Sequence, residues 1–363
     1  MNESSRETIS SPVASPALAR SIPFEFHAKG GEYFRIWIVN LLLTIVTLGI
    51  YSAWAKVRRL RYFYGNTRLD GAAFDYHGRP IAIFKGRLVA VGAYGAFYGL
   101  THFFPFAAIG FLPLFLFGVP WIIMESRRFQ MRMTSYRGIR FGFDGHYRGA
   151  LKAYIGWPIV AAFTLYLLGG RMVWEQVRYL LANSRYGSEP ARFTTGRGPF
   201  HVMFLVSTAL FLSIVVVAFG TIGWFVTVAE PGEDPEKIAA TLTTPTALGL
   251  YVAVILAYTA TLAYYQKSFL NASFGGLELG PHRVESRLET GPLFVLYLTN
   301  FILIVLTLGL YAPWAKVRQM KYQMESLRVV AAGDLDAFAA GLGDGTDAIG
   351  EEIGDFFDID FGL

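Results

Sequence analysis

Six histidines are the side chains best suited to metal binding or proton transfer, and none lies in a recognisable motif. They are His27, His77, His102, His146, His201 and His282, and no two show the spacing of a zinc site. His102 is the only histidine in the apolar hairpin 88–124, where it could relay protons, although at a hairpin turn it would simply meet water. The chain has no cysteine, no Gly-rich phosphate loop and no GxSxG elbow. We therefore expect no enzyme, no cofactor and no metal site.

Polar residues inside apolar runs form a second group that could bind a solute or an ion. Asn40 and Asn300 lie 260 residues apart, and Thr47-Leu48-Gly49 is matched at the same offset by Thr307-Leu308-Gly309. If these segments are unwound points of discontinuous helices, free carbonyls and the asparagines could line a solute or ion pathway. Alternatively, the glycines are close contacts between helices and the asparagines form hydrogen bonds across helices.

Aromatic and basic residues follow each Thr-Leu-Gly segment, as is typical of a membrane interface. Tryptophan and tyrosine concentrate at headgroup level, where lysine and arginine meet lipid phosphates. The predicted lipid anchors are Tyr51, Trp54, Lys56, Arg58, Tyr311, Trp314, Lys316 and Arg318. The basic clusters are short and tied to helix ends, which argues against nucleic acid. The expected partner is therefore a lipid bilayer with anionic headgroups.

Composition indicates which elements must carry these residues. Of 363 residues, 53% are hydrophobic and 16% are charged, against about 25% charged in a typical soluble domain. Three stretches without Asp, Glu, Lys or Arg exceed the roughly 20 residues of a spanning helix. They are 88–124, which has room for two spans broken near Pro105, 201–229 and 238–266. We therefore expect an integral membrane protein that crosses by the hairpins 88–124 and 201–266.

Three shorter stretches, 36–55, 153–170 and 290–315, are marginal for spanning or begin with helix breakers. Every neighbouring segment apart from the acidic loop around Asp234 is rich in Lys and Arg, which keeps short loops in the cytoplasm. We therefore predict that the three stretches re-enter, with Arg185 and Arg318 cytoplasmic and Asp234 outside. The alternative is seven spans with one basic loop outside.

Self-similarity organises the chain. TLGIYSAWAKVR over 47–58 and TLGLYAPWAKVR over 307–318 share nine of twelve residues, and weaker echoes recur elsewhere. Alternating apolar pairs indicate short half-buried strands at Phe24/Phe26, Phe74/Tyr76, Phe141/Phe143 and Leu277/Leu279. The expected fold class is an all-α polytopic membrane protein with an internal tandem repeat and short cytoplasmic β elements.

The TLGxYxxWAKVR block, the segment Asn66–Gly71 and the terminal AIGEEIGDFFDIDFGL resemble the YjgN-like family of bacterial inner-membrane proteins. The resemblance extends from about Phe24 to Leu363 and implies a multi-pass protein of the inner membrane. Together with the charge pattern, it puts the basic loops and the C-terminus in the cytoplasm. The family is a domain of unknown function, so it implies no catalytic residues.

The C-terminal segment 333–363 carries nine acidic residues and no Lys or Arg, whereas the rest has a net charge of +14. We expect this tail to dock on basic loops, with Asp355, Asp358 and Asp360 near Arg58, Arg128 or Arg185 and the nearby phenylalanines in an apolar groove. The alternatives are a solvated tail or one that binds another protein. Two DxD patterns, at 334–336 and 358–360, are read as solvated acids rather than cation sites.

The expected domains are a disordered tail over 1–23, a repeat-built membrane domain over 24–329 and an acidic tail over 330–363. The repeat and the broken helices favour transport of, or a channel for, a small solute or lipid. The alternative is a non-transport envelope scaffold or lipid-interacting protein. In a transporter Asn40, Asn300 and Thr47 should line a central cavity, and in a scaffold they should lie in helix contacts.

Overall fold

The computed structural model describes residues 20–228 and 244–342, and within them one succession of elements recurs five times. Each unit is a strand, two successive helical segments that form an antiparallel pair, and a second strand. Most of the expected tail over 1–23, the loop around Asp234 and residues 343–363 lie outside the described residues.

The five units have the following bounds. The first is β1 (Arg20–Phe26), α1 (Gly30–Val46), α2 (Ser52–Gly65) and β2 (Thr67–Leu69), and the second is β3 (Ala72–Tyr76), α3 (Pro80–Phe103), α4 (Ala107–Arg132) and β4 (Thr134–Tyr136). The third is β5 (Ile139–Phe143), α5 (Tyr147–Leu151), a π-helical turn (Lys152–Gly156), α6 (Trp157–Phe163), α7 (Gly169–Ala182) and β6 (Ser184–Tyr186). The fourth is β7 (Glu189–Phe193), α8 (Gly198–Val228), α10 (Pro245–Phe274) and β8 (Leu277–Leu279). The fifth is β9 (His282–Ser286), α11 (Thr290–Leu306), α12 (Ala312–Glu325) and β10 (Leu327–Ala331), after which comes α13 (Leu335–Gly341).

The ten strands close into an antiparallel barrel, so the expectation of an all-α fold is wrong. The two strands of each unit pair with each other, tight hairpins join successive units, and β10 pairs with β1 to close the ring. The expected strands at Phe24/Phe26, Phe74/Tyr76, Phe141/Phe143 and Leu277/Leu279 are confirmed as parts of β1, β3, β5 and β8. The closure was missed because it joins strands about 300 residues apart, and no local pattern of alternation carries that information.

Aromatic side chains fill the barrel. Phe74 stacks on Tyr136 with ring centroids 4.7 Å apart, and Phe141 lies 5.0 Å from Tyr186. The hydroxyl of Tyr136 donates to the carbonyl of Leu69 (2.7 Å), and the hydroxyl of Tyr186 donates to the carbonyl of Tyr136 (2.9 Å). Burial raises the pKa of Tyr186 to about 12. An eight-stranded barrel is just wide enough to be filled by side chains, so the large rings fit the wider bore of ten strands.

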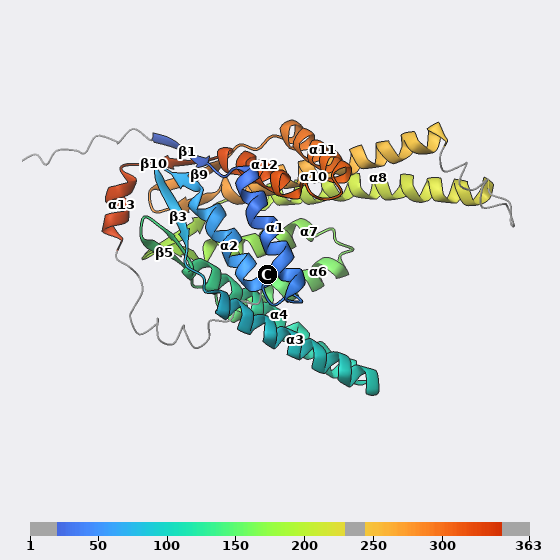
Figure 1. Cartoon of the computed structure of the whole chain (residues 1–363), viewed down its shortest axis with the longest axis horizontal. Helices are drawn as coiled ribbons and strands as arrows, with labels where there is room; N and C mark the ends of the chain where they lie inside the picture. Colours follow the sequence, from blue (N-terminus) through green and yellow to red (C-terminus); the bar gives the residue numbers. More distant parts are fainter. Residues whose placement is uncertain (1–19, 229–243, 343–363) are drawn as a thin grey trace, which may run out of the picture.

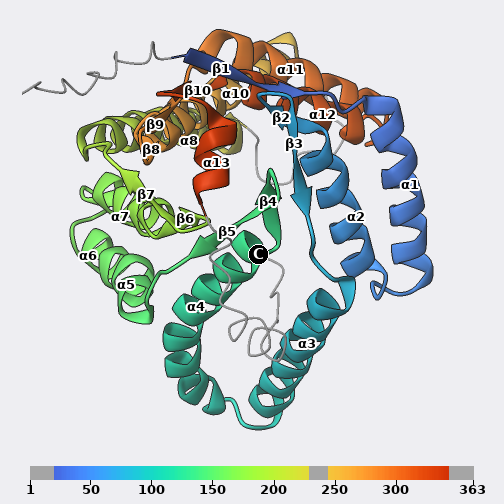
Figure 2. The same cartoon turned by 90° about the vertical axis from the view of Figure 1, so that its left-hand side faces the viewer.

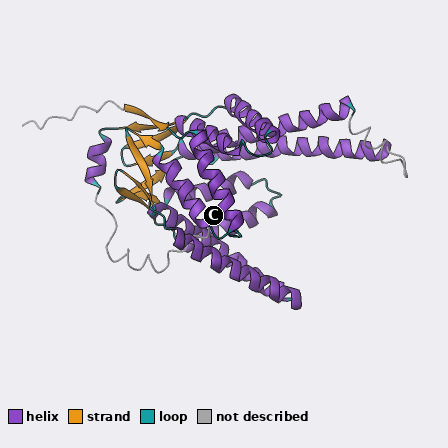
Figure 3. Ribbon diagram, viewed as in Figure 1, coloured by secondary structure: helices purple, strands orange, loops and turns teal. Residues whose placement is uncertain are grey.

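All helix pairs leave the barrel at one end, and α13 covers the other (Figures 1 and 3). Seen from the α13 side, the helices surround the strands as a ring (Figure 2). The second helix of each unit packs on the first helix of the next, and α12 packs on α1, which closes the helix ring as β10 closes the barrel. Hydrophobic clusters fill these seams, for example Phe26, Tyr33, Phe63 and Val317 between the last unit and the first.

The same backbone hydrogen bond closes every unit where its strands meet its helices. In each unit the amide after the first strand donates to the carbonyl that precedes the second. The five bonds run from His27 to Asn66, His77 to Met133, Asp144 to Asn183, Thr194 to Gly276 and Arg287 to Ser326, at 2.8–2.9 Å. This shared bond sets a common geometry for helix pairs of different length.

Two of the five helix pairs are long. Helices α3 and α4, with the stretches Gly198–Thr221 of α8 and Ala247–Phe274 of α10, are long and apolar enough to cross a membrane. They coincide with the predicted hairpins, and the break near Pro105 falls between α3 and α4. The two long pairs diverge as they leave the barrel (Figure 1). The predicted stretches 36–55, 153–170 and 290–315 each lie within a short helix pair, and each of these pairs starts and ends at the barrel.

Candidate functional site

The three short helix pairs end in turns of one design, each built on a threonine. The turns cover residues 47–51, 164–168 and 307–311. Thr47 Oγ1 donates to the carbonyl of Leu43 (2.7 Å) and accepts from the amide of Tyr51 (2.9 Å). Thr307 repeats both bonds with Leu303 and Tyr311, and Thr164 accepts from the amide of Leu168 at 3.4 Å.

The backbone amides of these turns are also satisfied within the turn. In the first turn the amide of Leu48 donates to Ile45, that of Gly49 to Thr44 and that of Ile50 to Thr47. Corresponding bonds form at Leu308, Gly309 and Leu310, and at Leu165, Tyr166 and Leu167. Complete internal pairing of backbone groups is what a hydrocarbon environment requires, because no water is available there.

A leucine lies at the apex of each turn in a left-handed conformation. Leu48, Leu165 and Leu308 have φ of 49°, 50° and 50°, and their exposed fractions are 94%, 88% and 94%. A left-handed L-residue costs roughly 1–2 kcal/mol, and exposing a leucine to water forgoes roughly 1.5–3 kcal/mol more. Lipid at the apex would remove the second cost. The neighbouring residues Val46, Phe163 and Leu306 are also exposed and apolar.

Thr-Leu-Gly is therefore a turn motif in this structure. Gly49 and Gly309 have φ of 91° and 92°, and a side chain at either position would meet no atom within 4 Å. Their role is conformational, since glycine adopts positive φ without strain. Neither a close helix contact nor an interrupted helix describes them.

Asn40 and Asn300 are both buried, with exposed fractions of 8% and 7%. Asn300 Nδ2 donates to the carbonyl of Ala315 (3.3 Å), and Arg318 Nη1 donates to Asn300 Oδ1 (2.8 Å). These bonds join α11 to α12. Asn40 Oδ1 is buried without a hydrogen-bond partner in the described part of the chain.

The aromatic members of the predicted lipid anchors pack between helices. Tyr51 stacks on Trp54 at 6.2 Å, and Tyr311 stacks on Trp314 at 5.9 Å, with interplanar angles of 13° in both pairs. Trp314 also stacks on Phe34 at 4.7 Å, where α12 meets α1. Trp314 therefore helps to close the helix ring, and the contact of these rings with lipid stays a prediction.

The basic members of that set differ in their surroundings. Arg318 donates a hydrogen bond to Asn300, whereas Arg58 and Lys316 are exposed. Of the arginines predicted to receive the acidic tail, Arg128 pairs with Glu125 (2.7 Å) and Arg185 with Asp144 (3.2 Å). The tail residues Asp355, Asp358 and Asp360 lie outside the described residues, so docking stays a prediction.

The mouth of the barrel holds an ion cluster that sequence reasoning missed. Arg137 Nη2 lies 3.0 Å from Asp70 Oδ2, and Arg137 Nη1 pairs with Asp336 of α13. His282 accepts a hydrogen bond at Nδ1 from the amide of Ala332 and meets the ring of Phe338 edge-on at 4.5 Å. Burial lowers the pKa of His282, which favours the neutral imidazole. The side chain of Asp336 is 75% exposed, as expected for a solvated acid, and its pairing with Arg137 also links α13 to the barrel.

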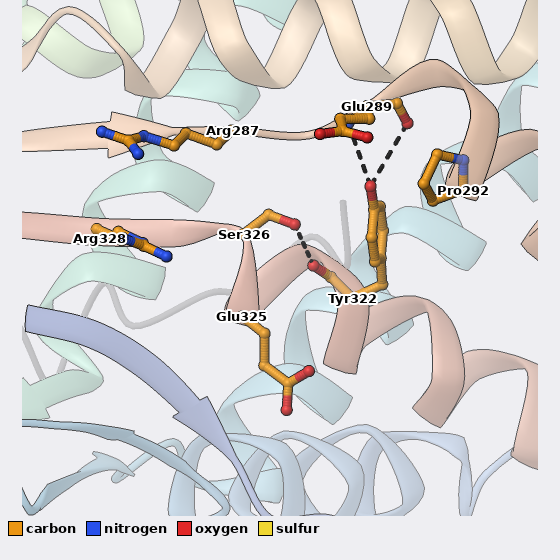
Figure 4. Close-up of a pocket in the computed structure, with 7 residues that line it drawn as sticks. All are labelled: Arg287, Glu289, Pro292, Tyr322, Glu325, Ser326 and Arg328. Carbon is orange, nitrogen blue, oxygen red and sulfur yellow. Dashed lines mark hydrogen bonds between the residues drawn. The ribbon is translucent and has the colours of Figure 1, made fainter.

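A depression of about 360 Å³ lies where the last unit joins the barrel (Figure 4). Tyr322 stands at its centre, accepting from the amide of Glu289 (3.1 Å) and donating to the Glu289 carbonyl (3.5 Å). The other lining residues are Arg287, Pro292, Glu325, Ser326 and Arg328. Tyr62 forms the same bonds with Lys29 in the first unit, so the tyrosine is a structural brace. Opposite charges line the depression without a nucleophile–base pair.

Across residues 20–228 and 244–342, no group of three or more His, Cys, Asp or Glu side chains is placed to hold a metal ion.

The family model described as "Bacterial protein of unknown function (DUF898)" matches residues 21–356. The chain belongs to the DUF898 family. That span starts within β1 and runs beyond α13, so it takes in all ten strands of the barrel.

Relatives within the DUF898 family match part of the chain. The inner membrane protein YjgN of Salmonella typhimurium is 34% identical over 144 residues, and YjgN of Escherichia coli O157:H7 is 35% identical over 163. These matches cover 39% and 44% of this chain, and 36% and 40% of the relatives. No solved structure matches the chain. The predicted resemblance is confirmed, and the chain is a bacterial inner membrane protein of unknown function with four candidate spans.

Proposed function

We propose that this protein is a lipid-interacting scaffold of the inner membrane, neither an enzyme nor a transporter. In this arrangement the barrel stands in the cytoplasm, the two long helix pairs cross the bilayer, and the three short pairs enter one leaflet. The observation that carries it is the trio of short turns, which pair their own backbone amides and expose leucine at the apex. Those are properties of a segment that ends in hydrocarbon.

The length of the short pairs supports the leaflet arrangement. The uncharged part of α1 runs from Ile36 to Val46, which at 1.5 Å per residue is about 16 Å. One leaflet contributes about half of the roughly 30 Å hydrocarbon core. A short pair whose charged ends lie at the headgroups would therefore bring its apex near the midplane.

The placement of the intramembrane polar residues favours a scaffold over a transporter. The side chain of Asn300 forms hydrogen bonds with Ala315 and Arg318, and the hydroxyl of Thr47 forms its hydrogen bonds within its own turn. Aromatic rings fill the barrel, and α13 covers its end. We further propose that the five units are copies of one repeat, which the shared closing bond and the matched Thr-Leu-Gly turns support.

Single cysteines test the proposal cleanly because the chain has none of its own. We expect a bimane fluorophore at position 48, 165 or 308 to be quenched most by lipids with a nitroxide near the end of the acyl chain. A fluorophore at 185, on β6, should be quenched by aqueous iodide only. An N40C variant should react with a small hydrophilic thiol reagent only after unfolding, because the position is buried. Iodide quenching at the three apices, or rapid labelling at 40, would contradict the scaffold.

A further inference from the structure

Three arginines surround one tryptophan at the seam between the third and fourth units. The guanidinium carbons of Arg171, Arg178 and Arg197 lie 5.3, 5.2 and 5.2 Å from the ring centroid of Trp174. Arg171 also lies 4.6 Å from the ring of Trp157. Such distances are within the range of cation–π attraction.

The charges of this cluster do not balance. Arg171 is neutralised by Glu175, whose Oε1 lies 2.9 Å from Nη2, and both side chains are largely buried. Arg178 and Arg197 are exposed, and neither has a carboxylate partner among the described residues. Two positive charges are thus held on one indole without compensation. An incoming anion would relieve their mutual repulsion.

The cluster is held rigidly. Trp174 is buried, and its Nε1 donates to the carbonyl of Thr195 (2.8 Å), two residues before Arg197. Gly170 lets α7 approach α8 closely, because a Cβ there would overlap the backbone of Phe200 and His201. The backbone that carries both exposed arginines is therefore fixed, and each guanidinium rests on the buried indole, which lowers the ordering cost of binding.

Its position along the chain corresponds to headgroup level. The uncharged stretch 153–170 contains the turn 164–168 of the third helix pair, and the uncharged stretch of α8 begins directly after Arg197. Arg178 lies further along α7, about 15 Å from the end of that turn at 1.5 Å per residue. With the turn in one leaflet, the two exposed arginines lie at the boundary between acyl chains and water. Tryptophan and arginine are both favoured at that depth.

We propose that Arg178, Arg197 and Trp174 form a binding site for the phosphate-bearing headgroup of an anionic phospholipid. The two guanidinium groups donate hydrogen bonds to phosphate oxygens, and the buried indole beneath them is a positioning residue. Planar guanidinium groups suit phosphate because they can donate two parallel bonds. This inference rests on the proposed leaflet arrangement for the source of the ligand.

The test uses the full chain, purified in a neutral detergent and titrated with dioctanoyl phosphatidylglycerol. Binding is measured as the rise in the unfolding temperature of the protein. An R178Q/R197Q variant removes both exposed charges. An R192Q/R283Q variant is the matched control, because it removes two exposed arginines from the barrel wall. We expect the affinity of the first variant to fall about tenfold, which corresponds to about 1.4 kcal/mol, and that of the control to be unchanged.

Separate arms identify the ligand. Dioctanoyl phosphatidylcholine tests the need for net negative charge, and inorganic phosphate tests the need for a lipid. Equal affinity of R178Q/R197Q and the wild-type protein would overturn the site, and phosphate binding as tight as phosphatidylglycerol would overturn the assignment to a lipid. The titration is done in micelles, so its failure is distinguishable from failure of the depth measurement at positions 48, 165 and 308.

Discussion

At the scale of single residues, Asn40 and Asn300 show that side chains at matched sequence positions can differ in their hydrogen bonds, and so in their contribution to stability. Both are buried at the same point of a short helix pair, as the shared offset of 260 suggests. Arg318 turns to Asn300, whereas its counterpart Arg58 is exposed and Asn40 Oδ1 has no partner within the described ranges. Sequence matching therefore predicted the environment of the pair but not the bonds, which depend on side-chain direction.

A matched pair of substitutions separates the two asparagines. We expect N300L to lower the free energy of unfolding by about 1–3 kcal/mol, because it breaks the bond to the Ala315 carbonyl and leaves Arg318 short of an acceptor. N40L should be neutral or slightly stabilising, because it removes an unsatisfied buried oxygen. Thermal unfolding in one detergent measures both. Equal destabilisation by the two variants would contradict the assigned bonding.

Part of the arginine cluster on Trp174 can be recognised in the sequence once the bounds of α7 are known. Arg171, Trp174 and Arg178 are spaced three and four residues apart, so they share one face of α7. Arg197 joins them from the start of α8 through the packing of two units. No spacing along the chain predicts that contact.

At the scale of elements, the short helix pairs were predictable and the hairpins between units were overlooked. Apolar length and charge marked all five helix pairs. Asp70-Gly71 and Arg137-Gly138 have positive φ at both residues, the geometry that tight hairpins favour. Asp-Gly is a strong hairpin signal. Arg-Gly is a weak one, and Arg137 is held there by Asp70 and Asp336 from other parts of the barrel.

The seam between α12 and α1 depends on one glycine. A Cβ at Gly30 would overlap the ring of Trp314, whereas a Cβ at Gly31 would meet no atom within 4 Å. We expect G30A to destabilise the protein by about 2 kcal/mol, since Trp314 must move and overpacking costs 1–3 kcal/mol. G31A should gain a few tenths of a kcal/mol from helix propensity. Thermal unfolding of both variants checks this, and a harmless G30A would mean that the ring is not closed at this seam.

At the scale of the whole molecule, closure is the feature that sequence could not supply. Strands of three to seven residues are too short for their sequence pattern to predict a barrel. The ring of paired strands is complete only when all five units are in place. Pairing of β1 with β10 and packing of α1 on α12 join opposite ends of the chain. Membrane segments, by contrast, are encoded locally by apolar length, which is why their positions agreed with the structure.

The one-sided arrangement of the helix pairs makes a prediction about topology. Every pair starts and ends at the barrel, so an even number of crossings lies between any two strands, whereas a single crossing along α3 separates the strands from the segment between α3 and α4. We expect a cysteine at Phe104, exposed between α3 and α4, to react with an impermeant maleimide added to intact spheroplasts. Cysteines at Arg185 on β6 and at the apex position Leu48 should react only after the membrane is opened, or not at all. The basic loops set this direction, because short segments rich in lysine and arginine stay in the cytoplasm. Labelling of position 185 from outside would mean that the chain crosses at a short pair, and the barrel could then not form with all its strands on one side.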